Sequence, residues 1–226
     1  MSKLYLDFLT QLETNNNKAW MDAHKAEFVQ VKSEFLTDVE YLLKHITLWE
    51  PEMSALKPKD CVFRQNRDVR FSANKNPYKN NIAAYFAVGG KKSLGPGYYL
   101  HIQAGKSFVA GGIWMPPTDV LKNIRQEIDY SGQELVDLLA QPNFVSHFPH
   151  LEGEQLKTNP KGYPADHPFI DLLKFKSFIV SKPITDQDIK NRNFLDLSLE
   201  AFRQMKPFHH FLAKALDEAE GGSELL

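Results

Sequence analysis

Five basic residues stand close together in one segment of this chain. Within sixteen residues the segment contains Arg64, Arg67, Arg70, Lys75 and Lys79. A guanidinium group presents a fork of donors that matches two oxygens of a phosphate or carboxylate, and a lysine adds a point charge. The segment therefore predicts a site for a small anionic ligand that is phosphorylated or carboxylated.

The positive charge is local. Residues 57–92 contain nine Lys and Arg and two acidic residues, a net charge of +7, whereas the whole chain carries −1 and the remainder therefore −8. Acidic residues from elsewhere could instead pair these cations into a surface network, in which each pair contributes only ~0–1 kcal/mol. Too few acids lie within the segment to neutralise it, and this favours an anion site.

Three side chains near this segment could take part in proton transfer. Tyr99 and His101 alternate with apolar residues and so share one face of a predicted strand, and Tyr78 lies inside the basic segment. Phenol and imidazole groups hydrogen-bond ligands or exchange protons. If the protein is an enzyme, we expect Lys79 to stabilise developing negative charge and His101 or Tyr99 to handle the proton. A role as wall or core residues remains open for each.

The sequence predicts no metal site and no cofactor. The eight histidines form no recognised ligand pattern, and Cys61 is the single cysteine, which excludes an intramolecular disulfide and a cysteine-rich zinc site. We expect Cys61 to be a small buried side chain. Glycine-rich dinucleotide motifs, phosphate loops and serine-hydrolase elbows are absent from the sequence.

Length and hydropathy predict one soluble, cytoplasmic domain over residues 1–226. No apolar run approaches the roughly 20 residues that cross a bilayer, and Asp7 stands where a signal peptide would be apolar. The pI near 6.7 makes nucleic acid an unlikely partner. The oligomeric state is not predicted.

The elements that must position these residues predict an α+β fold, a mostly antiparallel sheet of about four to six strands with helices at both ends. Apolar residues at helical spacing predict a helical hairpin over residues 3–47, with a short first helix and a long second helix from its N-cap, Asn17, to about Ile46. A period of two then predicts a sheet within residues 61–115, with strands at 61–65, 82–88, 98–103 and 107–114. Gly111 and Gly112 indicate a bulge or a close backbone approach.

Helices and loops are expected over residues 117–220. A helix from about Leu121 should break at Tyr130, and Ser131 with Glu134 predicts a capping box for the next one. Pro168 fits the first position of a short helix, residues 176–180 suggest one more strand, and a long C-terminal helix should be restarted or kinked by Pro207. Residues 221–226 are expected to fray.

The chain resembles an uncharacterised family, found mostly in bacteria and fungi, that is known as domain of unknown function 2461. The most specific matching block is Arg67-Asp68-Val69-Arg70-Phe71-Ser72 followed by Lys75-x-Pro77-Tyr78-Lys79. Weaker matches include Asn15-Asn16-Asn17-Lys18-x-Trp20, Tyr98 to Ile102, and Lys161-Gly162-Tyr163-Pro164-x-Asp166-His167-Pro168. The family implies a single domain and these site positions, and it brings no established activity.

The resemblance adds three residues to the predicted site. Lys161, His167 and Lys176 are polar residues at family-motif positions, and core packing explains such residues poorly. We predict that they fold over the same cleft as Arg67, Arg70, Lys75 and Lys79. Two other functions stay open, a nucleic-acid-binding module and a module that docks an acidic partner protein.

Overall fold

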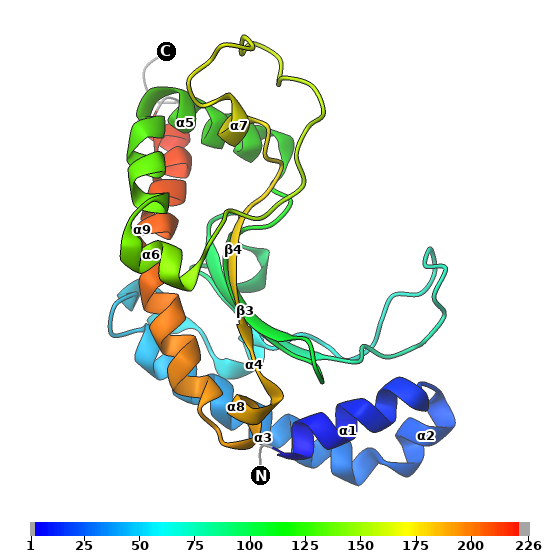
Figure 1. Cartoon of the computed structure of the whole chain (residues 1–226). Coiled ribbons are helices and arrows are strands. Elements are labelled where there is room, and N and C mark those ends of the chain that lie inside the picture. Colours follow the sequence, from blue (N-terminus) through cyan, green and yellow to red (C-terminus); the bar gives the residue numbers. More distant parts are fainter. Residues whose placement is uncertain (1–2, 222–226) are drawn as a thin grey trace. The chain divides into compact units, whose positions relative to one another are not determined.

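Four antiparallel strands form the sheet of this α+β protein, in the order β1-β2-β3-β4 (Figure 1). The computed structural model describes residues 3–221. The strands are β1 (Ile82–Phe86), β2 (Gly97–Ile102), β3 (Ser107–Ile113) and β4 (Phe178–Ile184). The predicted fold class is confirmed, as are the strands expected at 82–88, 98–103 and 107–114, and β4 lies close to the further strand expected at 176–180.

The chain divides into two compact units. The first contains residues 1–91, 99–109 and 183–200, and the second contains residues 92–98, 110–182 and 201–226. The single domain expected over residues 1–226 stays a prediction.

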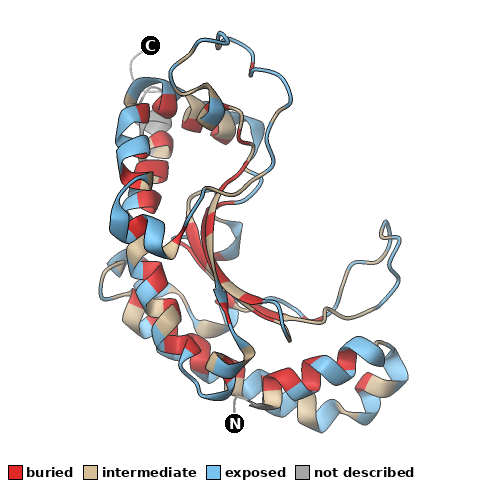
Figure 2. Cartoon of the chain, viewed as in Figure 1, coloured by how far each residue is buried: buried red, intermediate tan, exposed pale blue. Residues whose placement is uncertain are grey.

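Three helices begin the first unit, namely α1 (Lys3–Thr14), α2 (Lys18–Ala23) and α3 (Lys25–Ile46). Figure 2 shows a buried stripe along α1 and α3, as their apolar spacing requires. Tyr5 meets Phe35 edge to face at 6.1 Å, and Phe8 stacks on Phe28 at 5.7 Å. These aromatic contacts join α1 to α3, which confirms the predicted N-terminal hairpin.

The long helix predicted from Asn17 to Ile46 is interrupted at His24. Asn17 is the N-cap of α2, as expected, and accepts a hydrogen bond from the Trp20 N–H at 2.9 Å. His24 leaves the helical conformation, its Nδ1 lies 2.8 Å from the Trp20 carbonyl oxygen, and its ring stacks on the Trp20 ring. We attribute the break to this side chain, which binds the carbonyl that ends α2.

No regular strand forms at 61–65, and only an isolated antiparallel bridge between Val62 and Ala84 of β1 remains of that prediction. Pro58 occupies the start of a short helix, α4 (Pro58–Cys61), which follows the 3-10 helix η1 (Pro51–Ala55). Proline presets the backbone of a first helical turn, so Cys61 enters the core from a helix. Cys61 is fully buried, as expected, and burial raises the pKa of its thiol to about 11.

A buried carboxylate connects three parts of the first unit. Asp38 on α3 accepts a hydrogen bond from the Tyr5 hydroxyl at 2.7 Å and forms an ion pair with Arg192, which follows α8 (Asp186–Lys190). The Asp38 side chain is only 2% exposed. Arg192 has a φ of +62°, a conformation that non-glycine residues rarely adopt. This network fixes α1 and the end of α8 against α3.

Helices of the second unit include α5 (Thr118–Leu139), α6 (Pro142–His147) and α7 (Ile170–Leu173). The last helix, α9 (Phe194–Gly221), contributes residues 194–200 to the first unit and the rest to the second. Phe144 on α6 packs against Phe148 and Phe208, with ring centroids 5.0 and 6.3 Å away. The apolar faces of α6 and α9 meet at this cluster.

The break predicted at Tyr130 is confirmed as a kink at Ser131, where non-helical backbone angles (φ −118°, ψ 20°) separate two helical stretches of α5, whereas the capping box predicted there is wrong. Glu134, the expected box partner, pairs instead with Lys214 on α9 at 2.8 Å. A Cβ atom on Gly132 would stand 2.4 Å from the Phe169 ring. Glycine at this position lets the aromatic ring approach the kinked helix closely.

Two predictions rest on proline, and one of them is wrong. Pro168 does not occupy the first helical position, since α7 begins at Ile170 with Phe169 as its N-cap. The long C-terminal helix is confirmed as α9, which continues through Pro207 instead of restarting there; the alternative of a kink at Pro207 stays a prediction. The expected fraying of residues 221–226 concerns residues that, apart from Gly221, lie outside the described range.

Close backbone approach explains the two adjacent glycines of β3. Gly112 has a φ of +122°, and a Cβ atom there would lie 2.0 Å from the Phe178 carbonyl oxygen. At Gly111 it would lie 2.5 Å from the Met205 sulfur and 2.6 Å from His209 Nε2. A side chain is excluded at both positions by β4 or by α9, as the sequence indicated.

His209 is enclosed on the inner face of α9. Its ring lies 4.4 Å from the Tyr98 ring, and its Nε2 has no hydrogen-bond partner among the described residues. Burial lowers the pKa of His209 to about 3. The imidazole is therefore neutral at physiological pH.

We expect acidification to destabilise the protein through His209. Below a pH of about 6.5 the unfolded state binds a proton that the native imidazole does not bind until pH approaches 3, so the free energy of unfolding falls as pH drops. Between pH 7 and pH 5 this linkage removes about 2 kcal/mol. Urea unfolding at both pH values should show that, between pH 7 and pH 5, the free energy of unfolding falls by about 2 kcal/mol less in His209→Leu than in the wild type. His210→Leu alters the exposed neighbouring histidine and is the control; equal pH dependence of the wild type and His209→Leu would contradict the prediction.

No helix within residues 3–221 combines the length and the apolar character that crossing a membrane requires.

Candidate functional site

The basic segment forms an irregular hairpin, which we call the basic loop (residues 64–79). Its two arms are joined where the Lys79 N–H donates to the Gln65 carbonyl oxygen at 2.9 Å and the Arg67 N–H donates to that of Pro77, also at 2.9 Å. An isolated bridge pairs Asn66 with Tyr78. Figure 1 shows the loop extending from the sheet, and Figure 2 shows that its outer part is exposed or half-buried. Backbone pairing at its base therefore orders this segment without a regular strand.

Asn16 attaches the basic loop to the N-terminal helices. From the turn between α1 and α2, its side-chain nitrogen donates to the Tyr78 carbonyl oxygen at 3.0 Å, and its side-chain oxygen accepts the Tyr78 N–H at 3.0 Å. One amide side chain thus satisfies both backbone groups of Tyr78, as a neighbouring strand would.

A pocket lies between this turn and the arms of the loop. Its volume is about 390 Å3, and every side chain that lines it is polar or charged. The lining residues are Glu13, Asn16, Arg67, Asn74, Asn76, Tyr78, Lys79, Asn80 and Asn81. All of them belong to the first unit. Three residues of the predicted site, Arg67, Tyr78 and Lys79, are therefore brought together.

Arg67 is held in the pocket by neutral partners. Its guanidinium group donates to the Asn76 carbonyl oxygen and to the Ser72 hydroxyl, each at 3.3 Å. Among the side chains that the structure describes, it has no carboxylate partner. Two weak bonds to neutral oxygens leave Arg67 without a direct carboxylate contact, so an anion can bind it.

Lys79 has no carboxylate partner in the described part of the chain either. Its ammonium group lies 5.2 Å from the centroid of the Phe63 ring, and that of Lys91 lies 5.7 Å from it. Burial lowers the pKa of Lys79, and the positive charges of Arg64 and Lys91 lower it further. A bound anion would relieve this repulsion.

Tyr99 and His101 form a hydrogen-bonded pair on β2 that reaches the pocket through Asn81. The Tyr99 hydroxyl and Asn81 Nδ2 lie 3.1 and 3.3 Å from His101 Nδ1, and His101 Nε2 lies 3.0 Å from Gln103 Oε1. Because Gln103 Oε1 accepts only, the neutral ring carries its proton on Nε2 and accepts at Nδ1. The predicted proximity of Tyr99 and His101 is confirmed.

Burial sets the protonation states of this pair. It raises the pKa of Tyr99 to about 12. Burial also lowers the pKa of His101, a bond to Gln103 partly opposes this, and the charge of Lys79 lowers it further. At neutral pH a protonated phenol thus donates to a neutral imidazole. Through the bond to His101, this pair orients the Asn81 amide that lines the pocket.

Other predicted residues of the basic loop lie outside the pocket lining. Arg70 forms an ion pair with Asp68 at 2.6 Å, and its side chain is 76% exposed. Lys75 donates to the Val69 carbonyl oxygen at 3.1 Å, and Arg64 is exposed beside Lys79. Their role in ligand binding stays a prediction.

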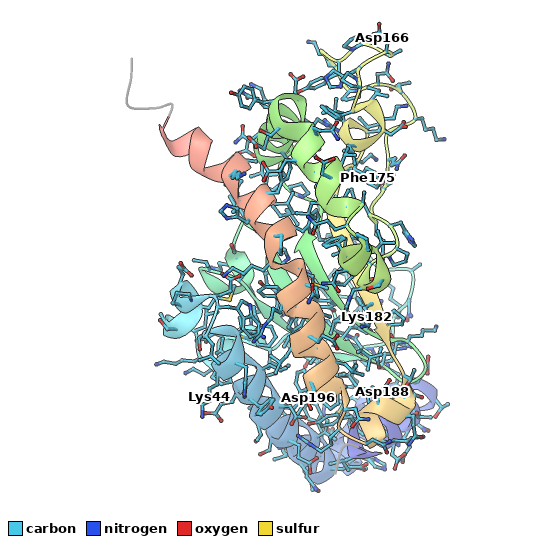
Figure 3. The ribbon with its side chains drawn as sticks, turned by 60° about the vertical axis from the view of Figure 1, so that its left-hand side comes forward. Lys44, Asp166, Phe175, Lys182, Asp188 and Asp196 are labelled. Carbon is cyan, nitrogen blue, oxygen red and sulfur yellow. The ribbon has the colours of Figure 1, made fainter. Side chains whose placement is uncertain are left out.

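Three predicted residues belong to the second unit. Lys161 is exposed, His167 Nε2 lies 2.8 Å from Asp129 on α5, and Lys176 pairs with Glu154 at 2.9 Å. Figure 3 shows Asp166, next to His167, at the outer end of the loop that precedes α7. That these three residues face the same cleft as the basic loop stays a prediction.

The amide side chains of the pocket were missed as site residues. Asn74, Asn76, Asn80 and Asn81 flank the basic residues in the sequence, and this local excess of asparagine was the available signal. Glu13 gave no signal, because it lies on a helix far from the loop in sequence. In the described residues, no three His, Cys, Asp or Glu side chains are grouped to hold a metal ion.

Comparison with known proteins gives one result. Searches of curated proteins and of solved structures give no match. A family model matches residues 4–211, which include the basic loop, the pocket and all predicted site residues. The chain therefore belongs to the family described as "Conserved hypothetical protein (DUF2461)".

Proposed function

We propose that the protein binds a small anionic ligand in the pocket of the basic loop. The observation that carries the proposal is that Arg67 and Lys79 line one pocket and have no carboxylate partner within the described residues. Both groups can direct charged donors to one phosphate or carboxylate, and Lys79 is additionally destabilised by its cationic neighbours.

The recessed position of these charges favours a small molecule. A nucleic acid or an acidic partner protein would contact a broad surface, whereas a concave polar site encloses a ligand of limited size. If the ligand is chemically converted, His101 and Tyr99 are the groups that we propose for proton transfer, because they are the titratable groups that lie next to the pocket-lining Asn81. A cytoplasmic location is part of the same proposal, and the buried free thiol of Cys61 is compatible with a reducing compartment.

Charge removal in the pocket should weaken anion binding. We expect Arg67→Ala and Lys79→Met each to reduce the affinity for inorganic phosphate about tenfold, because each removes a charge-assisted hydrogen bond. Isothermal titration calorimetry measures the affinity. Lys59→Ala removes an equal charge from the exposed surface of α4 and should leave the affinity within about twofold. If folded Arg67→Ala and Lys79→Met both bind phosphate like the wild type, the proposed site is wrong.

A further inference from the structure

The pocket lining contains hydrogen-bond acceptors as well as cations, and acceptors need a ligand that can donate hydrogen bonds. Beside Arg67 and Lys79, five asparagines and Glu13 line it. Asn16 uses both its nitrogen and its oxygen to bind the backbone of Tyr78. The other amides are available in part, and which of their atoms remain available indicates the chemistry of the ligand.

Four side-chain oxygens of the lining, from Glu13, Asn76, Asn80 and Asn81, have no partner among the side chains that the structure describes. Asn80 uses its nitrogen to donate to Glu13 Oε1 at 3.1 Å, which leaves its own oxygen and Glu13 Oε2 without a donor. Asn81 uses its nitrogen toward His101, and its oxygen is likewise left. Deprotonated phosphate and carboxylate oxygens cannot donate to these atoms, and the charge of Glu13 repels them.

Donors of the lining are also incompletely used. The Asn76 side chain makes no hydrogen bond among the described residues, and Asn74 uses only its oxygen, which accepts the Asn76 N–H at 2.9 Å. Two amide nitrogens therefore line the same pocket as the four unused oxygens. A hydroxyl group both donates and accepts, so a run of hydroxyls matches this mixture of partners.

We propose that the ligand is a phosphorylated sugar or polyol. This inference rests on the proposed anion site: the phosphate pairs with Arg67 and Lys79, and the hydroxyls pair with the amides and Glu13. The volume of about 390 Å3 falls within the range of pockets that enclose small molecules. An ammonium group could also satisfy Glu13, but it has no acceptor for Asn74 and Asn76 and would be repelled by Arg67 and Lys79.

Three probes separate these chemistries, namely inorganic phosphate, glucose 6-phosphate and O-phosphoserine. We expect wild-type protein to bind glucose 6-phosphate at least about tenfold more tightly than inorganic phosphate, because a site built for hydroxyls gains from them. O-Phosphoserine, which places an ammonium group beside the phosphate, should bind more weakly than glucose 6-phosphate. Calorimetry or competition by NMR measures all three affinities.

Glu13→Gln is expected to change the affinities for glucose 6-phosphate and for inorganic phosphate differently. It keeps the oxygen that accepts from Asn80 and removes a negative charge and a hydroxyl acceptor. We expect the affinity for glucose 6-phosphate to fall about tenfold and that for inorganic phosphate to stay equal or rise. Glu40→Gln, at an exposed position of α3, should change neither affinity.

The two proposals fail differently. If inorganic phosphate binds through Arg67 and Lys79 but glucose 6-phosphate binds no more tightly, the sugar assignment is wrong and the anion site stands. The sugar assignment is also wrong if O-phosphoserine binds most tightly, or if Glu13→Gln leaves the affinity for glucose 6-phosphate unchanged. If none of the three probes binds, the anion site itself is contradicted.

Discussion

Gly112→Ala should destabilise the protein by roughly 3–5 kcal/mol, the sum of backbone strain and steric overlap. The φ of +122° is unfavourable for alanine, and the new methyl carbon would stand 2.0 Å from the carbonyl oxygen of Phe178. That oxygen belongs to the backbone of β4, so no side-chain rotation relieves the clash. Urea unfolding followed by circular dichroism measures the loss.

Gly105→Ala is the matched control for this substitution. Gly105 also has a positive φ, +68°, but nothing lies within 4 Å of the position that its Cβ would occupy. Its free energy of unfolding should fall by only about 1 kcal/mol, the cost of placing alanine in a left-handed backbone conformation. If Gly112→Ala and Gly105→Ala lowered the free energy of unfolding by similar amounts, contact with Phe178 would not constrain β3.

Asp38→Ala should lower the free energy of unfolding by about 3 kcal/mol, since it leaves the buried Tyr5 hydroxyl and the Arg192 guanidinium without their partner. Arg192 is partly exposed, and this keeps the loss at the lower end of what breaking a buried pair costs. Thermal and urea unfolding of the purified variant provide the measurement.

Two companion variants test whether the network carries this effect. Asp22→Ala breaks the exposed i,i+4 pair with Lys18 and should change stability by no more than about 0.5 kcal/mol. Tyr5→Phe combined with Asp38→Ala should cost clearly less than the two single losses added together, because both remove the same hydrogen bond. Simple additivity would mean that Tyr5 and Asp38 act independently.

Much of the fold could be predicted because hydrophobic periodicity reports directly on burial. Alternation in Tyr98, Leu100 and Ile102 located β2, and the adjacent glycines of β3 indicated a close approach that the structure contains. These signals are local, since each depends on residues within one element. The sheet of four strands with helices before and after it follows from them.

Predictions were wrong where a side chain interacts with a distant partner or with a particular backbone group. Ser131 and Glu134 have the residue types of a capping box, yet Glu134 pairs with Lys214, eighty residues away. His24 ends α2 through a hydrogen bond to a carbonyl oxygen, and residue type alone does not report such a bond. Propensity at these positions was outweighed by tertiary contacts.

The site was only partly accessible from sequence for a similar reason. Charge identified Arg67 and Lys79, and strand alternation placed Tyr99 beside His101. Charge could not distinguish Arg67 from Arg70, because the pairing of Arg70 with Asp68 depends on how the loop turns. The contributions of Glu13 and Asn16 depend on the helical turn reaching the loop, which no local pattern encodes.

The contact between Asn16 and Tyr78 has a consequence for how the pocket responds to ionic strength. It joins two neutral groups, so dissolved ions hardly weaken it, whereas they screen the attraction of Arg67 and Lys79 for an anion over about 10 Å at 0.1 M. Concentrated salt would therefore release the bound anion while the pocket keeps its shape.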